Sequence, residues 1–377
     1  MHRSGSGKSE MSTLKILHAA DFHLDTPFEG LPEEKTKLRR TEQRMLLSSL
    51  AELARNERVD LMLLPGDLVD GEKVFYETES AMVRAFGSVA CPVVIAPGNH
   101  DCFTPKSIYS RISLPENVFV FRKNEIECIE FDDLGVRVFG AAFTDRYSRP
   151  LLESFHAERY PGTINLLCLH GETDVRESRY DPITSKQLAE SGIDYAALGH
   201  IHKQSGLKRV GDTYYSWPGC PEGRGFDETG ARYVSIVEID RESREVTLRY
   251  ASIARRKYEI LNVDISGAEP ILAIHSLLPD DTQNDIYRIV LTGETDSSSD
   301  AAMLQNNLEG LFFQLQIRDE TRLRQDIWEK AGNDTLRGIF LAKLKAASDS
   351  AADEEEKNRI EMAARWGLAA LDNMEVV

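Results

Sequence analysis

Five short segments of the chain carry residue types that bind metal ions and take part in phosphate ester hydrolysis. In chain order these residues are Asp21 and His23, Asp67 and Asp70, Asn99 with His100 and Asp101, His170, and finally His200 and His202. Mixed carboxylate, amide and imidazole ligands suit manganese or iron, and also zinc, and differ from all-thiolate sites. Because one carboxylate can bridge two cations, the segments together predict a dinuclear hydrolytic centre.

Glycine turns help to expose these side chains. Gly66, Gly98 and Gly199 stand directly before the second, third and fifth sets of polar residues, and glycine allows a tight turn at the end of a strand. In the third set, the Asn99 amide can bind a metal ion while His100 faces the substrate. An Asp101 carboxylate beside that ring would fix its tautomer and favour its charged form.

The elements that position these segments are predicted to alternate between strands and helices. Apolar runs at 14–19, 60–64 and 92–96 read as buried strands, and leucines at helical spacing indicate a helix over 33–56. A second helix is expected at 76–89. Each polar segment follows such a strand, which is where open α/β sheets place their ligand sites. Eight further strands between 117 and 251 favour two sheets packed face to face with helices outside.

A different pattern begins after Arg255, Arg256 and Lys257, which we interpret as a solvated hinge. Strands and helices alternate between 258 and 318, as in a small α+β unit, and 321–377 is helical with two apolar faces. We therefore expect a disordered extension at 1–12, a catalytic domain at 13–255, an accessory domain at 256–320 and a helical region at 321–377.

The ordered motifs D-x-H, G-D-x-x-D, G-N-H-D, H-G and G-H-x-H resemble those of the calcineurin-like metallophosphoesterases. The segments 16–24 and 217–228 also resemble the SbcD-type DNA repair exonucleases, particularly the YhaO-like branch. The resemblance implies a four-layer α-β-β-α sandwich with a small α+β capping domain and a helical C-terminal tail.

The resemblance also implies a role for each site residue. The first metal ion would take Asp21, His23, Asp67 and His202, and the second Asp67, Asn99, His170 and His200. His100 matches the catalytic histidine of the family, and Asp101 would orient it. Outside the ligand set, Arg224 is either a contact to a substrate phosphate or part of a hairpin loop. Asp25 and Asp70 are either groups that hold ligands or turn residues, and His18 is read as structural.

For function, the resemblance implies a manganese-dependent nuclease that cleaves DNA phosphodiesters as an exonuclease, and also as an endonuclease, in DNA repair. It further implies an SbcC- or YhaN-type coiled-coil ATPase as partner and a homodimer formed through the helices at 33–56 and 76–89. One alternative is a phosphodiesterase of cyclic nucleotides or other small nucleotides. Another is a metal-stabilised scaffold without catalytic activity, which the complete ligand set and the intact His100 disfavour.

Composition limits the classes of protein to consider. The formal net charge of −17 disfavours non-specific binding to DNA or to anionic membranes, although a basic groove can exist on an acidic protein. No apolar run is long enough for a membrane span, and the N-terminus lacks the apolar stretch of a secretory signal. Five scattered cysteines without C-x-x-C spacing indicate a reducing compartment. We therefore expect a cytoplasmic protein.

Overall fold

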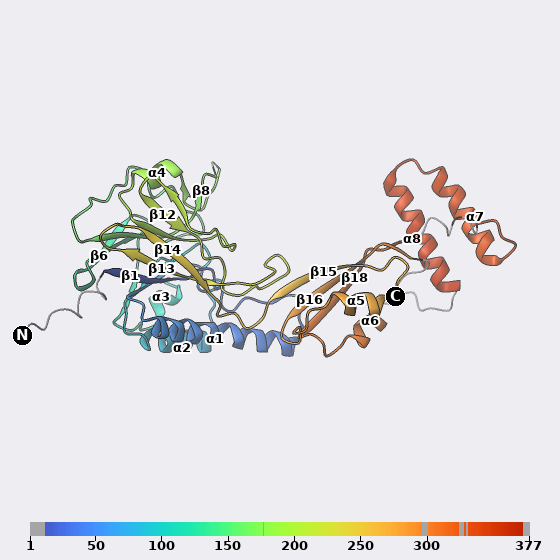
Figure 1. Cartoon of the computed structure of the whole chain (residues 1–377), viewed down its shortest axis with the longest axis horizontal. Coiled ribbons are helices and arrows are strands. Elements are labelled where there is room, and N and C mark those ends of the chain that lie inside the picture. Colours follow the sequence, from blue (N-terminus) through green and yellow to red (C-terminus); the bar gives the residue numbers. More distant parts are fainter. Residues whose placement is uncertain (1–11, 176, 296–300, 324–327, 329–330, 372–377) are drawn as a thin grey trace, which may run out of the picture. The chain divides into compact units, whose positions relative to one another are not determined.

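The computed structural model describes residues 12–175, 177–295, 301–323, 328 and 331–371 (Figure 1). The chain forms two compact units, Met1–Lys257 and Tyr258–Val377. Of the extension expected at 1–12, residues 1–11 lie outside the described part. No helix in the described ranges is long and apolar enough to cross a membrane.

The first sheet of unit 1 carries the strands that precede three of the polar segments. Its order is β14-β13-β1-β2-β3-β4. The strands are β1 (Thr13–His18), β2 (Leu61–Leu64), β3 (Val93–Ile95), β4 (Val118–Val120), β13 (Val234–Asp240) and β14 (Val246–Ala251). Strands β1 to β4 are parallel neighbours, whereas β13 pairs antiparallel with β1. The carboxyl ends of β1, β2 and β3 therefore meet at one edge.

The second sheet carries the strands that precede the other two segments, in the order β11-β12-β10-β7-β6-β5. These are β5 (Glu127–Phe131), β6 (Val136–Gly140), β7 (Ile164–His170), β10 (Tyr195–Gly199), β11 (Lys208–Val210) and β12 (Thr213–Ser216). Strands β7 and β10 are parallel, and their register pairs Gly199 with His170. This register brings the last two polar segments together.

The sheets pack face to face through a largely apolar interface. Leu14, Ile16 and Leu63 of the first sheet contribute to one core with Leu166 and Tyr195 of the second. In a strand, alternate side chains point to opposite faces, so the intervening residues of the first sheet form a second core with the helices α1 (Glu33–Glu57) and α2 (Tyr76–Gly87). Figure 1 shows these two helices side by side.

The outer face of the second sheet completes the sandwich. The short helix α4 (Ser185–Glu190) supplies Leu188 to its core, and the loop after β6 supplies Leu151, Leu152 and Ala157. Shorter elements of unit 1 are α3 (Ile108–Arg111), η1 (Asp132–Leu134), β8 (Glu172–Thr173) and β9 (Pro182–Ile183). The predicted four-layer α/β sandwich is confirmed, with a fourth layer built largely from loops.

Four buried charged side chains join α1 to the end of unit 1. Arg39 lies 2.7 Å from Glu222 and 3.1 Å from Glu42, and Arg256 lies 2.6 Å from Glu42. Glu222 also accepts the backbone N–H groups of Arg255 and Arg256. Arg256 is 8% exposed, whereas the Arg255 side chain is 57% exposed, so the expectation of a solvated hinge is wrong for Arg256. Both oxygens of the Glu42 carboxylate accept from the Arg256 guanidinium and draw it inward.

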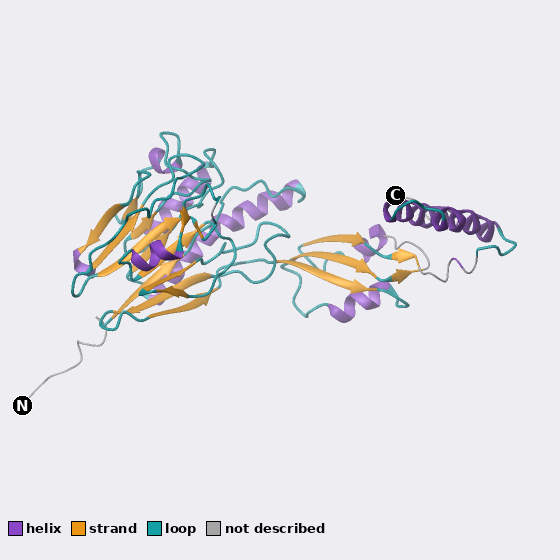
Figure 2. Cartoon of the chain, turned by 90° about the horizontal axis from the view of Figure 1, so that it is seen from above, coloured by secondary structure: helices purple, strands orange, loops and turns teal. Residues whose placement is uncertain are grey.

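Unit 2 contains a small parallel sheet and a helical pair (Figure 2). The sheet order is β15 (Tyr258–Asp264), β16 (Ile286–Thr292) and β18 (Gln314–Asp319), and α5 (Pro270–Leu277) and α6 (Ala301–Asn307) share one core with it. Two further short strands, β17 (Glu294–Thr295) and β19 (Arg322–Leu323), pair with each other. The helices α7 (Leu336–Asp349) and α8 (Glu354–Leu371) pack through Leu341, Ala364 and Leu368.

Candidate metal centre

The polar residues at the strand ends adopt unusual backbone conformations. Asp21, His23, Asp67 and His200 have φ values of 56°, 44°, 53° and 94°. Positive φ at a residue other than glycine costs on the order of 1–3 kcal/mol and is found mostly at functional sites. Hydrogen bonds between neighbouring turns hold this geometry, since the N–H of Asp21 donates to the carbonyl of Gly66.

Glycines let the two sheets approach each other most closely at this edge. A Cβ atom on Gly199 would lie 1.9 Å from the carbonyl oxygen of Pro65, and one on Gly98 would lie 2.8 Å from the His170 ring. These distances are far shorter than any real contact. Only glycine therefore fits here, and main-chain atoms of the two sheets come into direct contact beneath the polar side chains.

One group of side chains gathers around His23. Its Nε2 atom lies 3.2 Å from Nε2 of His202 and 3.6 Å from Oδ2 of Asp67. Ligand atoms of Asp21, His23 and His202 all lie within 4.8 Å of one another. The side chains of Asp21 and His23 are buried. This group corresponds to the first metal position expected from the sequence.

A second group shares Asp67 with the first. Oδ2 of Asp67 lies 3.4 Å from Nε2 of His170, which lies 2.9 Å from Oδ1 of Asn99. The same Asn99 oxygen lies 3.2 Å from Nδ1 of His200. Asp67 thus stands between the two groups, as a bridging carboxylate would. The structure brings together Asp21, His23, Asp67, Asn99, His170, His200 and His202.

The hydrogen bonds around two imidazoles indicate that these residues fit metal ions. Nδ1 of His170 lies 2.9 Å from the carbonyl oxygen of Pro65, and Nδ1 of His202 lies 2.7 Å from Oε1 of Glu228. The Pro65 carbonyl can only accept, so Nδ1 of His170 carries a hydrogen. At His202 the Glu228 carboxylate is the nearer partner of Nδ1, at 2.7 Å against 3.0 Å for Nη2 of Arg224, and it favours a hydrogen there too. Nε2 of each neutral ring then presents a lone pair to the cluster. Lone pairs that converge on carboxylate and amide oxygens need a cation between them.

The electrostatics of the cluster favour the same interpretation. Burial lowers the pKa of His23 to about 4 and that of His200 to about 3, and burial raises the pKa of Asp21 to about 6. Neutral imidazole is the form that binds metal. Burial also lowers the pKa of His170, but the charge of Asp67 outweighs it and raises this pKa to about 9. A metal ion would replace that proton, because ligand groups must be deprotonated.

Comparison with known proteins agrees with this geometry. Residues 14–204 match the calcineurin-like phosphoesterase family. The chain belongs to this family. It is therefore a metallophosphoesterase, a hydrolase whose family uses a dinuclear metal centre, and the cluster supplies candidate ligands for that centre.

Three relatives have informative descriptions. The chain is 28% identical over 282 residues to "Uncharacterized metallophosphoesterase YhaO" of Bacillus subtilis (strain 168), covering 72% of this chain and 68% of that protein. It is 28% identical to "DNA double-strand break repair protein Mre11" of Aeropyrum pernix, covering 68% and 65%. It is 24% identical to the SbcD component of the nuclease SbcCD of Bacillus subtilis, covering 60% and 66%. The matches thus span about two thirds of these relatives.

His100 lies beside the cluster, and its ring contacts Asp70 and not Asp101, the partner expected from the sequence. Its Nδ1 atom lies 2.7 Å from Oδ1 of Asp70, and its backbone N–H donates to Asp67. The hydrogen bond to Asp70 raises the pKa of His100. The His100 side chain is 44% exposed, whereas the imidazoles of His23 and His170 are buried and those of His200 and His202 are partly buried. It is therefore the imidazole of the site that is open to a substrate.

Asp101 does not orient the His100 ring as the sequence suggested. Its Oδ1 atom accepts the N–H groups of Gly98 and Asp67, and Oδ2 accepts the N–H of Leu68 and the hydroxyl of Tyr109. The tight turn after Gly98 points this carboxylate inward, toward free main-chain donors. Asp101 therefore ties the turns after β2 and β3 together, and Asp70 takes the role beside His100.

Arg224 and Glu228 form a buried pair next to His202. Arg224 donates three hydrogen bonds to Glu228, two from its guanidinium and one from its backbone N–H, and its Nη2 atom lies 3.0 Å from Nδ1 of His202. Arg224 is therefore held at the site, beside a ligand, and does not belong to a free hairpin loop. The contact between Glu228 and His202 could not be predicted from the sequence, because the two residues are 26 positions apart and no local pattern connects them.

Two other polar residues have structural partners. The buried ring of His18 contacts the hydroxyl of Tyr195 at 2.8 Å and the carbonyl of Leu198 at 3.2 Å, and so links the two sheets. Asp25 accepts the backbone N–H of Phe75 and the hydroxyl of Thr78 at the start of α2. Neither is a ligand in this geometry.

Proposed function

We propose that this metallophosphoesterase is a nuclease that hydrolyses DNA phosphodiester bonds, as an exonuclease and also as an endonuclease, in DNA repair. The observation that carries the proposal is the convergence of six ligand side chains around Asp67, with the exposed His100 beside them. Relatives described as a double-strand break repair protein and as part of a nuclease support DNA as the substrate.

The residues of the chain divide the work of such a reaction. Asp67 would hold both ions, Asp21, His23 and His202 would complete one site, and Asn99, His170 and His200 the other. Two divalent cations supply positive charge that activates water and offsets the negative charge on the phosphoryl oxygens. Manganese suits this mixture of oxygen and nitrogen ligands.

His100 would act on the leaving group. Asp70 accepts the Nδ1 hydrogen at 2.7 Å, which fixes the ring and stabilises its protonated form. Nε2–H can then donate to the oxygen that departs from phosphorus, where negative charge develops. Asp101 acts at a distance from this step by holding the turns that carry Asp67 and Asn99.

We also propose roles for the rest of the chain. Residues 256–320 would form an accessory domain that caps DNA, and 321–377 would dock a partner ATPase of the SbcC or YhaN type. One relative is described as one component of a nuclease, which supports work in a complex. On the helical pair, Leu336 and Trp366 are exposed and could contact such a partner. Free cysteines in the described structure support a cytoplasmic location.

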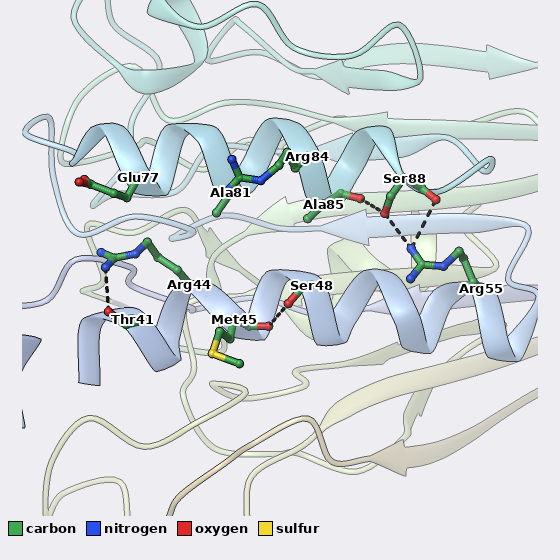
Figure 3. A pocket seen from close by; sticks show the side chains of 10 residues that line it. All are labelled: Thr41, Arg44, Met45, Ser48, Arg55, Glu77, Ala81, Arg84, Ala85 and Ser88. Carbon is green, nitrogen blue, oxygen red and sulfur yellow. Dashed lines mark hydrogen bonds between the residues drawn. The ribbon is translucent and has the colours of Figure 1, made fainter. Parts of the chain in front are cut away.

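A homodimer through α1 and α2 is a further part of this proposal. A groove between the two helices is lined by Met45, Ala81 and Ala85 together with Arg44 and Arg84 (Figure 3). Met45 is 47% exposed, and a second copy would cover it. Replacing it with a charge, Met45→Asp, should shift the mass measured by light scattering from dimer to monomer. An unchanged mass would place any dimer contact elsewhere.

The experiment that tests the nuclease assignment compares three substrates. Purified protein with Mn²⁺ is incubated with an end-labelled DNA duplex, a cyclic nucleotide and bis-p-nitrophenyl phosphate, with His100→Ala in parallel. We expect DNA shortening that depends on both Mn²⁺ and His100, while His100→Ala still binds metal. Turnover of the small esters alone, also in the presence of a partner ATPase, would refute DNA as the substrate and favour a small-nucleotide phosphodiesterase.

A further inference from the structure

Two loops beside the metal cluster are joined into one surface. One follows β6 and contains Arg146, Tyr147 and Ser148, and the other lies between β8 and β9 and contains Arg179 and Tyr180. The N–H of Ser148 donates to the carbonyl of Arg179 at 2.9 Å, and Ser148 and Tyr180 form a parallel β-bridge. These main-chain contacts fix the side chains of one loop against those of the other.

Aromatic rings run from the cluster onto this surface. The Tyr180 ring lies over the ring of His200, with centroids 4.7 Å apart and planes tilted by 34°. Tyr147 follows, with its centroid 5.7 Å from that of Tyr180. Tyr147 is 45% exposed, so this row of rings begins at a metal ligand and ends at a ring open to solvent.

The guanidinium groups of Arg146 and Arg179 lie over the exposed Tyr147 ring. The guanidinium carbon of Arg179 lies 5.3 Å from the centre of the Tyr147 ring, and that of Arg146 lies 6.0 Å from it. Within the described part of the chain neither guanidinium forms an ion pair, and the neighbouring Asp145 carboxylate accepts the backbone N–H of Arg146 instead. Two unpaired cations beside the site are notable in a protein of net charge −17.

We propose that Tyr147, Arg146 and Arg179 form a subsite for single-stranded nucleic acid next to the metal cluster. A nucleobase would stack on the Tyr147 ring, and the guanidinium groups would contact the phosphates on either side. Single-strand binding proteins combine these features, because every base has a flat face and every linkage a negative charge. The inference rests on the proposed nuclease function and adds that recognition includes a base as well as a phosphate.

The test separates bases from phosphates. Binding of a short labelled single strand is measured by fluorescence anisotropy in EDTA, which prevents cleavage, and compared with a strand of equal length built from abasic units. The wild-type protein should bind the strand with bases more tightly. Tyr147→Ala should lose roughly five- to one-hundredfold in affinity for that strand, as expected for one lost stacking contact, and little for the abasic strand. Tyr147→Phe keeps the ring and should retain binding.

Arg179→Gln tests the phosphate contact. It should weaken binding of both strands and reduce the slope of affinity against salt by about one.

Tyr160→Ala is the matched control. Tyr160 is 48% exposed and lies beside Arg137 at 4.6 Å, but it precedes β7 and so lies near the opposite end of the strand from His170. The inference is wrong if Tyr147→Ala behaves like Tyr160→Ala, or if it weakens both strands equally. Failure of the wild-type protein to cleave DNA would instead refute the nuclease function itself.

Discussion

Replacing Glu228 with glutamine tests whether a residue outside the ligand set controls metal affinity. Oε1 of Glu228 lies 2.7 Å from Nδ1 of His202 and 2.6 Å from Nη2 of Arg224. Burial acts to raise the pKa of Glu228, but hydrogen bonds from His202 and Arg224 hold it well below its usual range. The anion therefore orients the His202 ring and makes its Nε2 atom a better electron donor.

Glutamine keeps the shape of this side chain and removes its charge. A hydrogen bond to a charged group contributes about 1.5–3 kcal/mol, and a neutral one about 0.5–1.5 kcal/mol. The hydrogen bond to His202 is therefore weakened by about 1–1.5 kcal/mol. This corresponds to an increase of about tenfold in the dissociation constant of the metal ion that His202 binds. This agrees with the roughly 10- to 100-fold losses of metal affinity found when partners of ligand side chains are replaced.

Isothermal titration of the apoprotein with Mn²⁺ measures this loss directly. We expect Glu228→Gln to weaken one of two binding events about tenfold and to leave the other, around Asn99 and His170, unchanged. Glu190→Gln makes the same charge change on the exposed helix α4, where Glu190 pairs with Lys186, and should leave both events unchanged. Equal affinities for Glu228→Gln and Glu190→Gln would refute the reasoning.

Three further predictions concern ligand binding and stability. Asp67→Asn should abolish binding at both metal positions in the same titration, because Asp67 lies between them, and two intact binding events would contradict a bridging role. Burial raises the pKa of Asp181 from 3.8 to about 7, so its stability contribution is full below about pH 4 and is lost as pH rises through about 7. Asp181→Asn should therefore gain up to about 4 kcal/mol relative to wild type between pH 4 and pH 8, measured by urea unfolding in EDTA. A pH-independent difference would rule out this account. Arg39→Met should lower the free energy of unfolding by about 3–5 kcal/mol, because it leaves the buried Glu222 without its guanidinium. Loss of an exposed ion pair, as in Lys37→Met, should leave the free energy of unfolding nearly unchanged.

The sequence predicted the framework of the site well because its signals are local. The apolar runs at 14–19, 60–64 and 92–96 are interpreted as buried strands, and each is followed within three residues by its polar segment. The helix expected at 33–56 is present as α1 with almost the same ends. The predicted end of the second helix differs from the observed end, because the chain turns before residue 89. The helix expected to reach 89 ends at Gly87, and Ser88 caps it.

The partners of the site residues could not be predicted, because they depend on the direction of side chains after a turn. Asp70 and Asp101 both follow glycine turns within three or four residues, and from the sequence we expected Asp101 to be the partner of His100. Only the folded chain shows that Asp101 faces the main chain, whereas Asp70 faces the His100 ring. Glu228 and Tyr180 reach the site from distant loops, and nothing in their own segments indicates this.

The close approach of the two sheets at Gly98 and Gly199 has a consequence for the spacing of the ligands. At Gly199 the main chain of the second sheet rests on the Pro65 carbonyl of the first, and at Gly98 the main chain of the first sheet rests on the His170 ring of the second, so no apolar core side chain lies at these two contacts. The apolar residues elsewhere between the sheets can change volume and repack while this contact persists. The spacing of the ligands in this chain is therefore set by the backbone at these two glycines and is independent of how the apolar core is packed.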